Sequence, residues 1–122
     1  MDKYVRFNIW AKENGVRAES LEYPAVFGKG LVGIAAKSRV SPDEAFLFVP
    51  ASVLINDQRI QQSALGPIIG THPEVFFEHI DGEYLRIIFF VIWEMCKGEQ
   101  SFWAPYFAIV EETDLPIFWD QD

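Results

Sequence analysis

The feature that most constrains the fold is a long apolar segment in the second half of the chain. Residues 83–97 are almost uniformly apolar, and the segment is long enough to form a helix. Gly98 follows at the position where glycine commonly ends a helix. Because a helix that is apolar on every side has no face suited to water, the pattern predicts a helix that is buried all round. Cys96 lies in this segment and is predicted to be a small buried hydrophobic residue rather than a nucleophile.

The N-terminal part of the chain predicts a helix followed by short strands. Apolar residues recur at helical spacing from Tyr4 to Ala11, and Asn14-Gly15 supplies a stop signal, so residues 3–14 are predicted to form an amphipathic helix. The pattern then predicts a strand over residues 16–26, which Pro24 interrupts, and a second strand over residues 31–36. A turn is predicted over residues 41–44, and a short buried strand is predicted over residues 46–49.

The C-terminal part predicts helices separated by a loop. Residues 51–65 are predicted to contain one or two helical turns, and Gly and Pro mark residues 66–73 as a loop. Ser101 is a candidate cap for a helix that admits Pro105 only in its first turn. The aromatic side chains of this region are predicted to belong to the core, namely Phe102, Trp103, Tyr106 and Phe107. In the acidic tail, solvated charges are expected at Glu111, Glu112 and Asp114.

Charge and hydropathy exclude several classes of partner. The formal net charge is −8 and no cluster of Lys and Arg occurs, so neither a nucleic-acid backbone nor an anionic membrane surface is a favourable partner. The longest apolar run, residues 87–93, has seven residues, far below the roughly 20 that span a bilayer. One cysteine allows no internal disulfide, and the N-terminus lacks the apolar region of a secretory signal. These features predict an intracellular protein, cytoplasmic or nuclear, without a membrane span.

A Gly-x-Gly-x-x-Gly pattern occurs at Gly28, Gly30 and Gly33. Dinucleotide-binding sites place this pattern between a strand and a helix whose N-terminus faces the pyrophosphate. The residues that follow, IAAKSRVSPDEA, leave too little helix, and no acidic residue stands clearly at the ribose-binding spacing. A Walker-type phosphate loop is excluded because no G-K-[ST] occurs. The residues alone favour a turn between two strands, in which Gly28 and Gly30 supply positive φ and Gly33 allows close packing.

The order of several motifs resembles a known enzyme family. FNIWAKENG is followed by FGKGLVGIAA and then by SPDEAFLFVPASVLIN. The later blocks are the apolar helix, GEQSFWAPYFAIV and DLPIFW. This order is similar to that of SET-domain protein methyltransferases, in the branch that includes Rubisco large-subunit methyltransferase and actin-histidine methyltransferase. The resemblance covers nearly the whole chain, and it corresponds to the N-terminal half of the domain.

The resemblance implies a site for S-adenosylmethionine. In the family, the G-x-G turn lies against the methionine end of this cofactor and contacts it largely through backbone groups. Glycines let the main chain approach a ligand closely, and main-chain N–H and C=O groups can bond its carboxylate and ammonium. Family members often carry an acidic residue at the position of Phe27 and an apolar residue at the position of Lys29. The implied cofactor-binding residues are Phe27, Gly28, Lys29, Gly30 and Leu31.

The chain lacks the family's catalytic parts. The family's second half carries an Asn-His segment and a tyrosine that orients the target amine, and neither has a match here, so no catalytic residue is implied. His72 and His79, with Glu74 and Glu78 nearby, are too few ligands in too loose a scaffold to predict a metal site. The tyrosines, none of which stands in the matching context, are Tyr4, Tyr23, Tyr84 and Tyr106.

The predicted fold class is α+β. Residues 1–56 are predicted to form the N-terminal, β-rich part of a SET domain, and residues 57–122 are predicted to form the domain's mainly helical inserted region, which is incomplete. The predicted function is the N-terminal portion of a protein lysine or histidine methyltransferase that is inactive alone. A protein partner or the missing C-terminal half would cover its apolar surface. The alternative is a non-catalytic SET-like module that serves as a structural subunit or interaction scaffold. Self-association of two copies would restore packing but not catalysis, because an identical copy cannot supply Asn-His.

Overall fold

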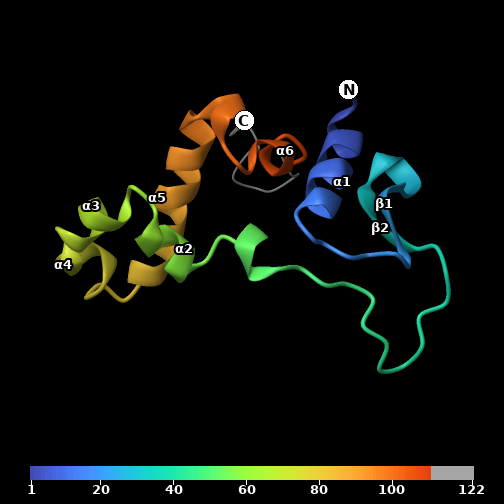
Figure 1. Ribbon diagram of the computed structural model, residues 1–122, viewed down its shortest axis with the longest axis horizontal. Coiled ribbons are helices and arrows are strands. Elements are labelled where there is room, and N and C mark those ends of the chain that lie inside the picture. Colours follow the sequence, from blue (N-terminus) through green and yellow to red (C-terminus); the bar gives the residue numbers. More distant parts are fainter. Residues whose placement is uncertain (111–122) are drawn as a thin grey trace, which may run out of the picture.

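The computed structural model describes residues 1–110, so the acidic tail lies outside the described residues. Helix α1 (Lys3–Glu13) begins where the carboxylate of Asp2 accepts hydrogen bonds from two N–H groups of the first turn. It ends at Asn14, and Gly15 follows with a φ of 85°. The predicted N-terminal helix is therefore confirmed. An antiparallel hairpin packs beside α1, at the opposite end of the molecule from helices α3 and α4 (Figure 1).

The hairpin consists of β1 (Leu21–Val26) and β2 (Val32–Ala36). The register shifts between Glu22 and Ala25, on either side of the cis Tyr23-Pro24 peptide bond. Tyr23 connects the hairpin to α1, because its ring meets the rings of Tyr4 and Phe7 edge-on, each at 5.6 Å between centroids. Both predicted strands are confirmed, although β1 begins five residues later than expected.

The segment between β2 and the helices departs from expectation. The predicted turn is present, since the N–H of Glu44 donates to the carbonyl of Ser41 over 3.1 Å. The predicted buried strand over residues 46–49 is wrong. Its side chains are 36–50% exposed, and its backbone pairs only through an isolated bridge between Phe48 and Arg17. The guanidinium of Arg17 also lies 4.6 Å from the ring centroid of Phe48, but one bridge does not make a strand, and the run stays half exposed.

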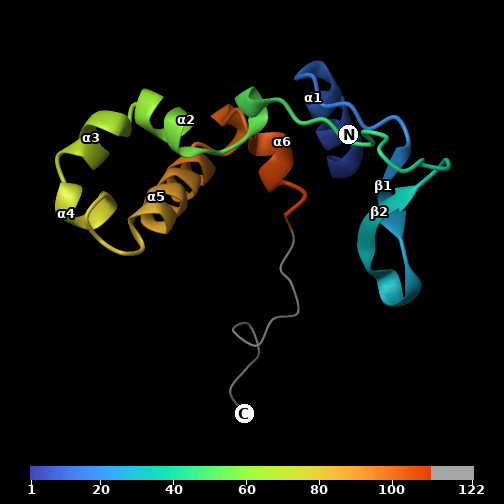
Figure 2. The ribbon, with the colours of Figure 1, turned by 90° about the horizontal axis from the view of Figure 1, so that it is seen from below.

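The second half of the described chain is helical (Figure 2). The expected loop over residues 66–73 is wrong, because its proline residues stand at the first turns of short helices. Gly66 is required there, since a Cβ would lie 2.0 Å from the carbonyl oxygen of Gln61. The α-helices are α2 (Asp57–Gln62), α3 (Gly66–Gly70), α4 (Pro73–Phe76), α5 (Gly82–Cys96) and α6 (Ala104–Phe107), and the 3-10 turns are η1 (Gly28–Gly30), η2 (Ala51–Val53) and η3 (Gly98–Gln100).

A small apolar core lies among these helices. It contains Ile60, Leu65, Ile69, Phe90 and Trp103. The indole N–H of Trp103 donates to the carbonyl of Val53 over 2.9 Å, which fixes the end of the connecting segment to the core. Of the four aromatic residues predicted to be core, Trp103 is buried and Phe107 packs against the core, whereas Phe102 and Tyr106 are exposed.

Helix α5 has the predicted length, and Gly98 follows it with a φ of 55°. Burial on all sides is wrong. Phe90 is buried, but Ile88, Ile92 and Met95 are 53–57% exposed. The neighbouring helices α2 and α4 pack against α5, and its opposite face is left to solvent. Cys96 lies at the end of α5 and is exposed, so the prediction of a buried thiol is wrong as well.

Glu94 is the buried charge of α5. Its carboxylate accepts hydrogen bonds from the ammonium of Lys97 over 2.5 Å and from the hydroxyl of Ser101 over 2.6 Å. The Ser101 oxygen in turn accepts from the N–H of Trp103 over 3.1 Å. The N-cap residue of α6 is Trp103 and no side chain caps this helix, so the prediction that Ser101 caps it is wrong, whereas Pro105 lies in its first turn as predicted.

An exposed ion pair joins the two ends of the described chain. Arg6 of α1 and Glu99 of η3 lie 2.5 Å apart. The hydrogen bond that Arg6 donates, and to a smaller extent its positive charge, hold the pKa of the Glu99 carboxyl below its ordinary value.

The helices and the one small antiparallel sheet of the described residues are consistent with the predicted α+β class. Within residues 1–110, no helix combines the length and apolar character that crossing a bilayer would require.

Candidate functional site

The five residues implied as cofactor-binding form the turn between β1 and β2. The N–H of Phe27 donates to the carbonyl of Leu31 over 2.8 Å, and the N–H of Gly30 donates to the carbonyl of Phe27 over 3.1 Å. These two bonds close the turn around η1. The hairpin therefore brings all five residues together at its tip.

Two residues of the turn have positive φ. They are Lys29, at 64°, and Gly30, at 77°. The expectation of positive φ is confirmed for Gly30 and wrong for Gly28, since Lys29 takes the second left-handed position instead. A lysine there costs conformational energy that a glycine would avoid, because its Cβ crowds the following carbonyl.

Gly33 lies under the ring of Phe27. A Cβ at Gly33 would stand 3.1 Å from the Cε2 atom of Phe27, so the predicted close packing is confirmed. The Phe27 side chain therefore covers the hairpin. Phe27 is still 47% exposed, and both of its backbone polar groups are used in the hydrogen bonds that close the turn.

The tip of the turn presents unused backbone groups. Among residues 1–110, the N–H groups of Gly28 and Lys29 take part in no backbone or side-chain hydrogen bond. A Cβ added at Gly28 or Gly30 would meet no atom within 4 Å. Two free donors beside open space, next to the ammonium of Lys29, can receive a carboxylate, because main-chain N–H groups and cations both favour anions.

We expect Gly30→Ala to destabilise the hairpin by about 1–2 kcal/mol, because an L-residue is disfavoured at a φ of 77°. Amide hydrogen exchange in β1 and β2 should speed up by about 5- to 30-fold. Gly28→Ala is the matched control, since it adds the same methyl group where φ is not positive and space is open. Its effect should stay within about 0.5 kcal/mol. Equal effects of the two variants would contradict the assigned turn geometry.

The two histidines lie elsewhere. His72 is 3.5 Å from a carboxylate oxygen of Glu74, and His79 is 3.8 Å from one of Asp81. In the described part of the chain, no group of three or more His, Cys, Asp and Glu side chains comes together in a metal-binding arrangement. The tail carboxylates that are expected to be solvated charges, Glu111, Glu112 and Asp114, lie outside the described residues.

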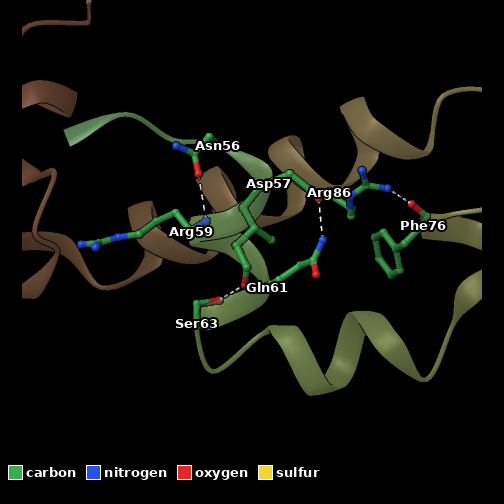
Figure 3. Close-up of polar contacts among 8 residues, drawn as sticks. Asn56, Asp57, Arg59, Gln61, Ser63, Phe76 and Arg86 are labelled. Carbon is green, nitrogen blue, oxygen red and sulfur yellow. Dashed lines mark hydrogen bonds and ion pairs between the residues drawn. The ribbon is translucent and has the colours of Figure 1, made fainter. Parts of the chain in front are cut away.

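Figure 3 shows a polar cluster between the helices that the sequence did not predict. The side chain of Arg86 on α5 donates to the carboxylate of Asp57 on α2 over 2.5 Å and also to the carbonyl of Phe76 at the end of α4. Its guanidinium lies 4.8 Å from the ring centroid of Phe77. Arg86 thus connects three helices and is a structural residue. A lone arginine within an apolar helix is the signal that could have indicated this role.

Sequence comparison relates the chain to protein methyltransferases, although no family model matches it. The similar proteins are actin-histidine N-methyltransferases. Those of Homo sapiens and Otolemur garnettii are 27% identical over 114 residues, and that of Drosophila melanogaster is 27% identical over 108 residues. These alignments cover 93%, 93% and 88% of this chain but 18% of each relative. The chain thus spans less than one fifth of the length of the curated relatives it matches.

Proposed function

We propose that the chain is the N-terminal portion of an S-adenosylmethionine-dependent SET-domain protein methyltransferase. Residues 1–56 would form the β-rich N-terminal part of the domain, and residues 57–122 would form the start of its inserted helical region. The observation that carries the proposal is the hairpin turn at residues 27–31, with free N–H groups beside open space. This turn lies in a chain that aligns with methyltransferases over 93% of its length.

The residues of the turn fit the amino-acid end of the cofactor. The N–H groups of Gly28 and Lys29 would hold its carboxylate, with the Lys29 ammonium nearby. Carbonyl oxygens of the turn would accept from its ammonium. The bound cofactor would supply an electrophilic methyl group. The turn itself would orient the cofactor and would exchange no proton, since its contacts are made by backbone amides.

The transfer step would need groups beyond this chain. The chain spans 18% of the relatives, and it contains neither the Asn-His segment nor the matching tyrosine. We therefore propose that the 122 residues alone are inactive. The names of the relatives favour a protein histidine over a lysine as the acceptor in the whole enzyme.

Calorimetric titration with S-adenosylhomocysteine tests the cofactor assignment. The folded chain should bind it saturably, and Gly28→Val should abolish binding, because a branched side chain would fill the space beside the free N–H groups. Lys29→Ala is the matched control, since it keeps the backbone donors and should retain most of the affinity. Absence of binding to a chain shown to be folded by circular dichroism would contradict a working site at this turn.

Exposed apolar residues favour a second candidate function, a non-catalytic module that serves as a structural subunit or interaction scaffold. The outer face of α5 and residues 46–49 both present large apolar side chains to solvent. A protein partner or a C-terminal half of the domain would cover them. A chain that binds no S-adenosylhomocysteine yet self-associates, or forms a stable complex with a separately expressed second half, would favour this function. A monomer at high concentration would count against it.

A further inference from the structure

The outer face of α5 carries a continuous apolar stripe. Its members stand three or four residues apart, namely Tyr84, Ile88, Ile92 and Met95. Residues at this spacing are neighbours on one side of a helix. The four side chains are 53–69% exposed, whereas α2 and α4 pack against the other face of α5 (Figure 2). The stripe therefore faces solvent along most of the helix.

No charge interrupts this stripe. Three residues of α5 are charged, and two of them lie on the packed face, since Arg86 is 12% exposed in its pair with Asp57 and Glu94 is 4% exposed. A surface helix normally turns its charged side chains to solvent and its apolar ones inward. In α5 the apolar side chains face both ways. Exposed apolar surfaces of this kind mark places that another molecule covers.

Carboxylates gather where the stripe begins. Glu78, Asp81 and Glu83 are exposed and lie close together in the sequence, beside the side chain of Ile80, which is 94% exposed. Among residues 1–110, no lysine or arginine pairs with any of the three carboxylates, and Asp81 lies 3.8 Å from the ring of His79. The first turn of α5 thus combines large apolar side chains with negative charge that no strong cation of the described chain meets.

This charge separates the candidate occupants of the stripe. A second copy of the chain fits poorly, because it would bring the same carboxylates and a further net charge of −8. Residues 111–122 fit poorly as well, because they carry five side-chain carboxylates and no lysine or arginine. A segment with cations fits, since opposite charges at the rim of an interface favour the correct partner and its register.

We propose that the outer face of α5 docks a basic amphipathic helix of a partner protein. The apolar face of that helix packs along the stripe, as helices do when residues at i, i+3, i+4 and i+7 anchor them to an apolar surface. The partner helix runs antiparallel to α5. Its C-terminal end, where lysine and arginine stabilise a helix, then lies beside Asp81 and Glu83. The proposal deepens the second candidate function, on which it rests, by stating the chemistry of the partner.

The test is fluorescence polarisation with the full chain and a labelled peptide of three heptads. The peptide has leucine at the a and d positions, lysine at the polar positions of its last heptad, and glutamine elsewhere. It should bind, and added salt should weaken binding without abolishing it, because the apolar contact persists when charges are screened. Two control peptides should not bind. One has glutamate in place of lysine, and the other has the same composition with its leucines scattered around the helix.

Variants of the stripe place the binding on α5. Ile92→Ser should weaken binding by about five- to tenfold, because it removes apolar area that the partner helix buries. Ile9→Ser is the matched control, since it makes the same change at an exposed position of α1 and should leave binding unchanged. If Ile92→Ser does not fold by circular dichroism, Ile88→Ser carries the test.

Charge variants test the acidic end of the stripe. Asp81→Asn combined with Glu83→Gln should weaken binding by about three- to tenfold, because two exposed charge contacts are lost. Glu13→Gln combined with Glu19→Gln changes the net charge equally at the other end of the molecule and should have no effect (Figure 1).

Several outcomes would overturn the proposal. They are no binding by the native chain, equal binding of either control peptide, and equal effects of the site variants and their controls. Self-association that Ile92→Ser removes would assign the stripe to a second copy and overturn it too. A chain that joins a separately expressed second half of the domain, but does not bind this peptide, would keep the second candidate function and overturn this inference alone.

Discussion

Phe90→Ala should lower the free energy of unfolding of the helical part by about 3–5 kcal/mol. Phe90 is 1% exposed and belongs to a core cluster of five buried residues. Its ring meets that of Trp103 edge-on at 5.4 Å between centroids. Removing it leaves a cavity that such a small core has few side chains to refill. Because small domains are stable by only about 5–15 kcal/mol, this loss is a large fraction of the total.

The matched control is Phe89→Ala. It deletes the same atoms at the adjacent position of α5, where the side chain is 39% exposed and, among residues 1–110, its ring meets only that of Phe76. Guanidinium unfolding followed by circular dichroism at helical wavelengths measures both variants. Phe90→Ala should shift the midpoint several times further than Phe89→Ala. Similar shifts would contradict the assignment of Phe90 to the core.

Arg86→Met should lower the free energy of unfolding by about 2–4 kcal/mol. The Arg86 side chain is 12% exposed, and its loss leaves the carbonyl of Phe76 without this donor and Asp57 without its cation. The expected cost stays below that of a fully buried pair, because Asp57 remains partly in contact with water. Methionine keeps most of the apolar stem, so the change reports mainly on the polar contacts.

The same unfolding experiment on Arg6→Met provides the comparison. Arg6 and Glu99 form an ion pair of equal length, but Glu99 is largely exposed, so the midpoint should move far less. Arg86→Lys should recover only part of the loss, because an ammonium cannot hold the fork geometry that reaches a carboxylate and a carbonyl together. A full recovery would show that charge alone matters at this position.

Local signals in the sequence predicted the ends of the two longest helices. The stop at Asn14-Gly15 and the glycine after α5 each depend on conformations set by a few neighbouring residues, and both are where the sequence placed them. The turn at the hairpin tip is likewise local, although Lys29 rather than Gly28 takes the second positive φ. The S-adenosylmethionine assignment at this turn stays a prediction.

Burial was harder to predict, because it depends on which elements come together. Residues 46–49 and the outer face of α5 are apolar, but composition does not say how much of them is covered, and residues 1–110 leave them partly exposed. The contact of the Arg59 guanidinium with two aromatic rings was missed for the same reason. The two rings, those of Phe102 and Trp103, follow far later in the chain, and no local pattern connects an arginine with them.

The hairpin that carries the candidate cofactor turn contains no buried residue in either strand. Its amides are therefore expected to open to solvent without unfolding of the helical core, on a faster timescale than the amides of α5. Only the closed hairpin presents the free N–H groups in one turn, so the apparent affinity of any ligand there is the intrinsic affinity multiplied by the closed fraction. Anything that clamps the hairpin shut would tighten binding without touching the ligand.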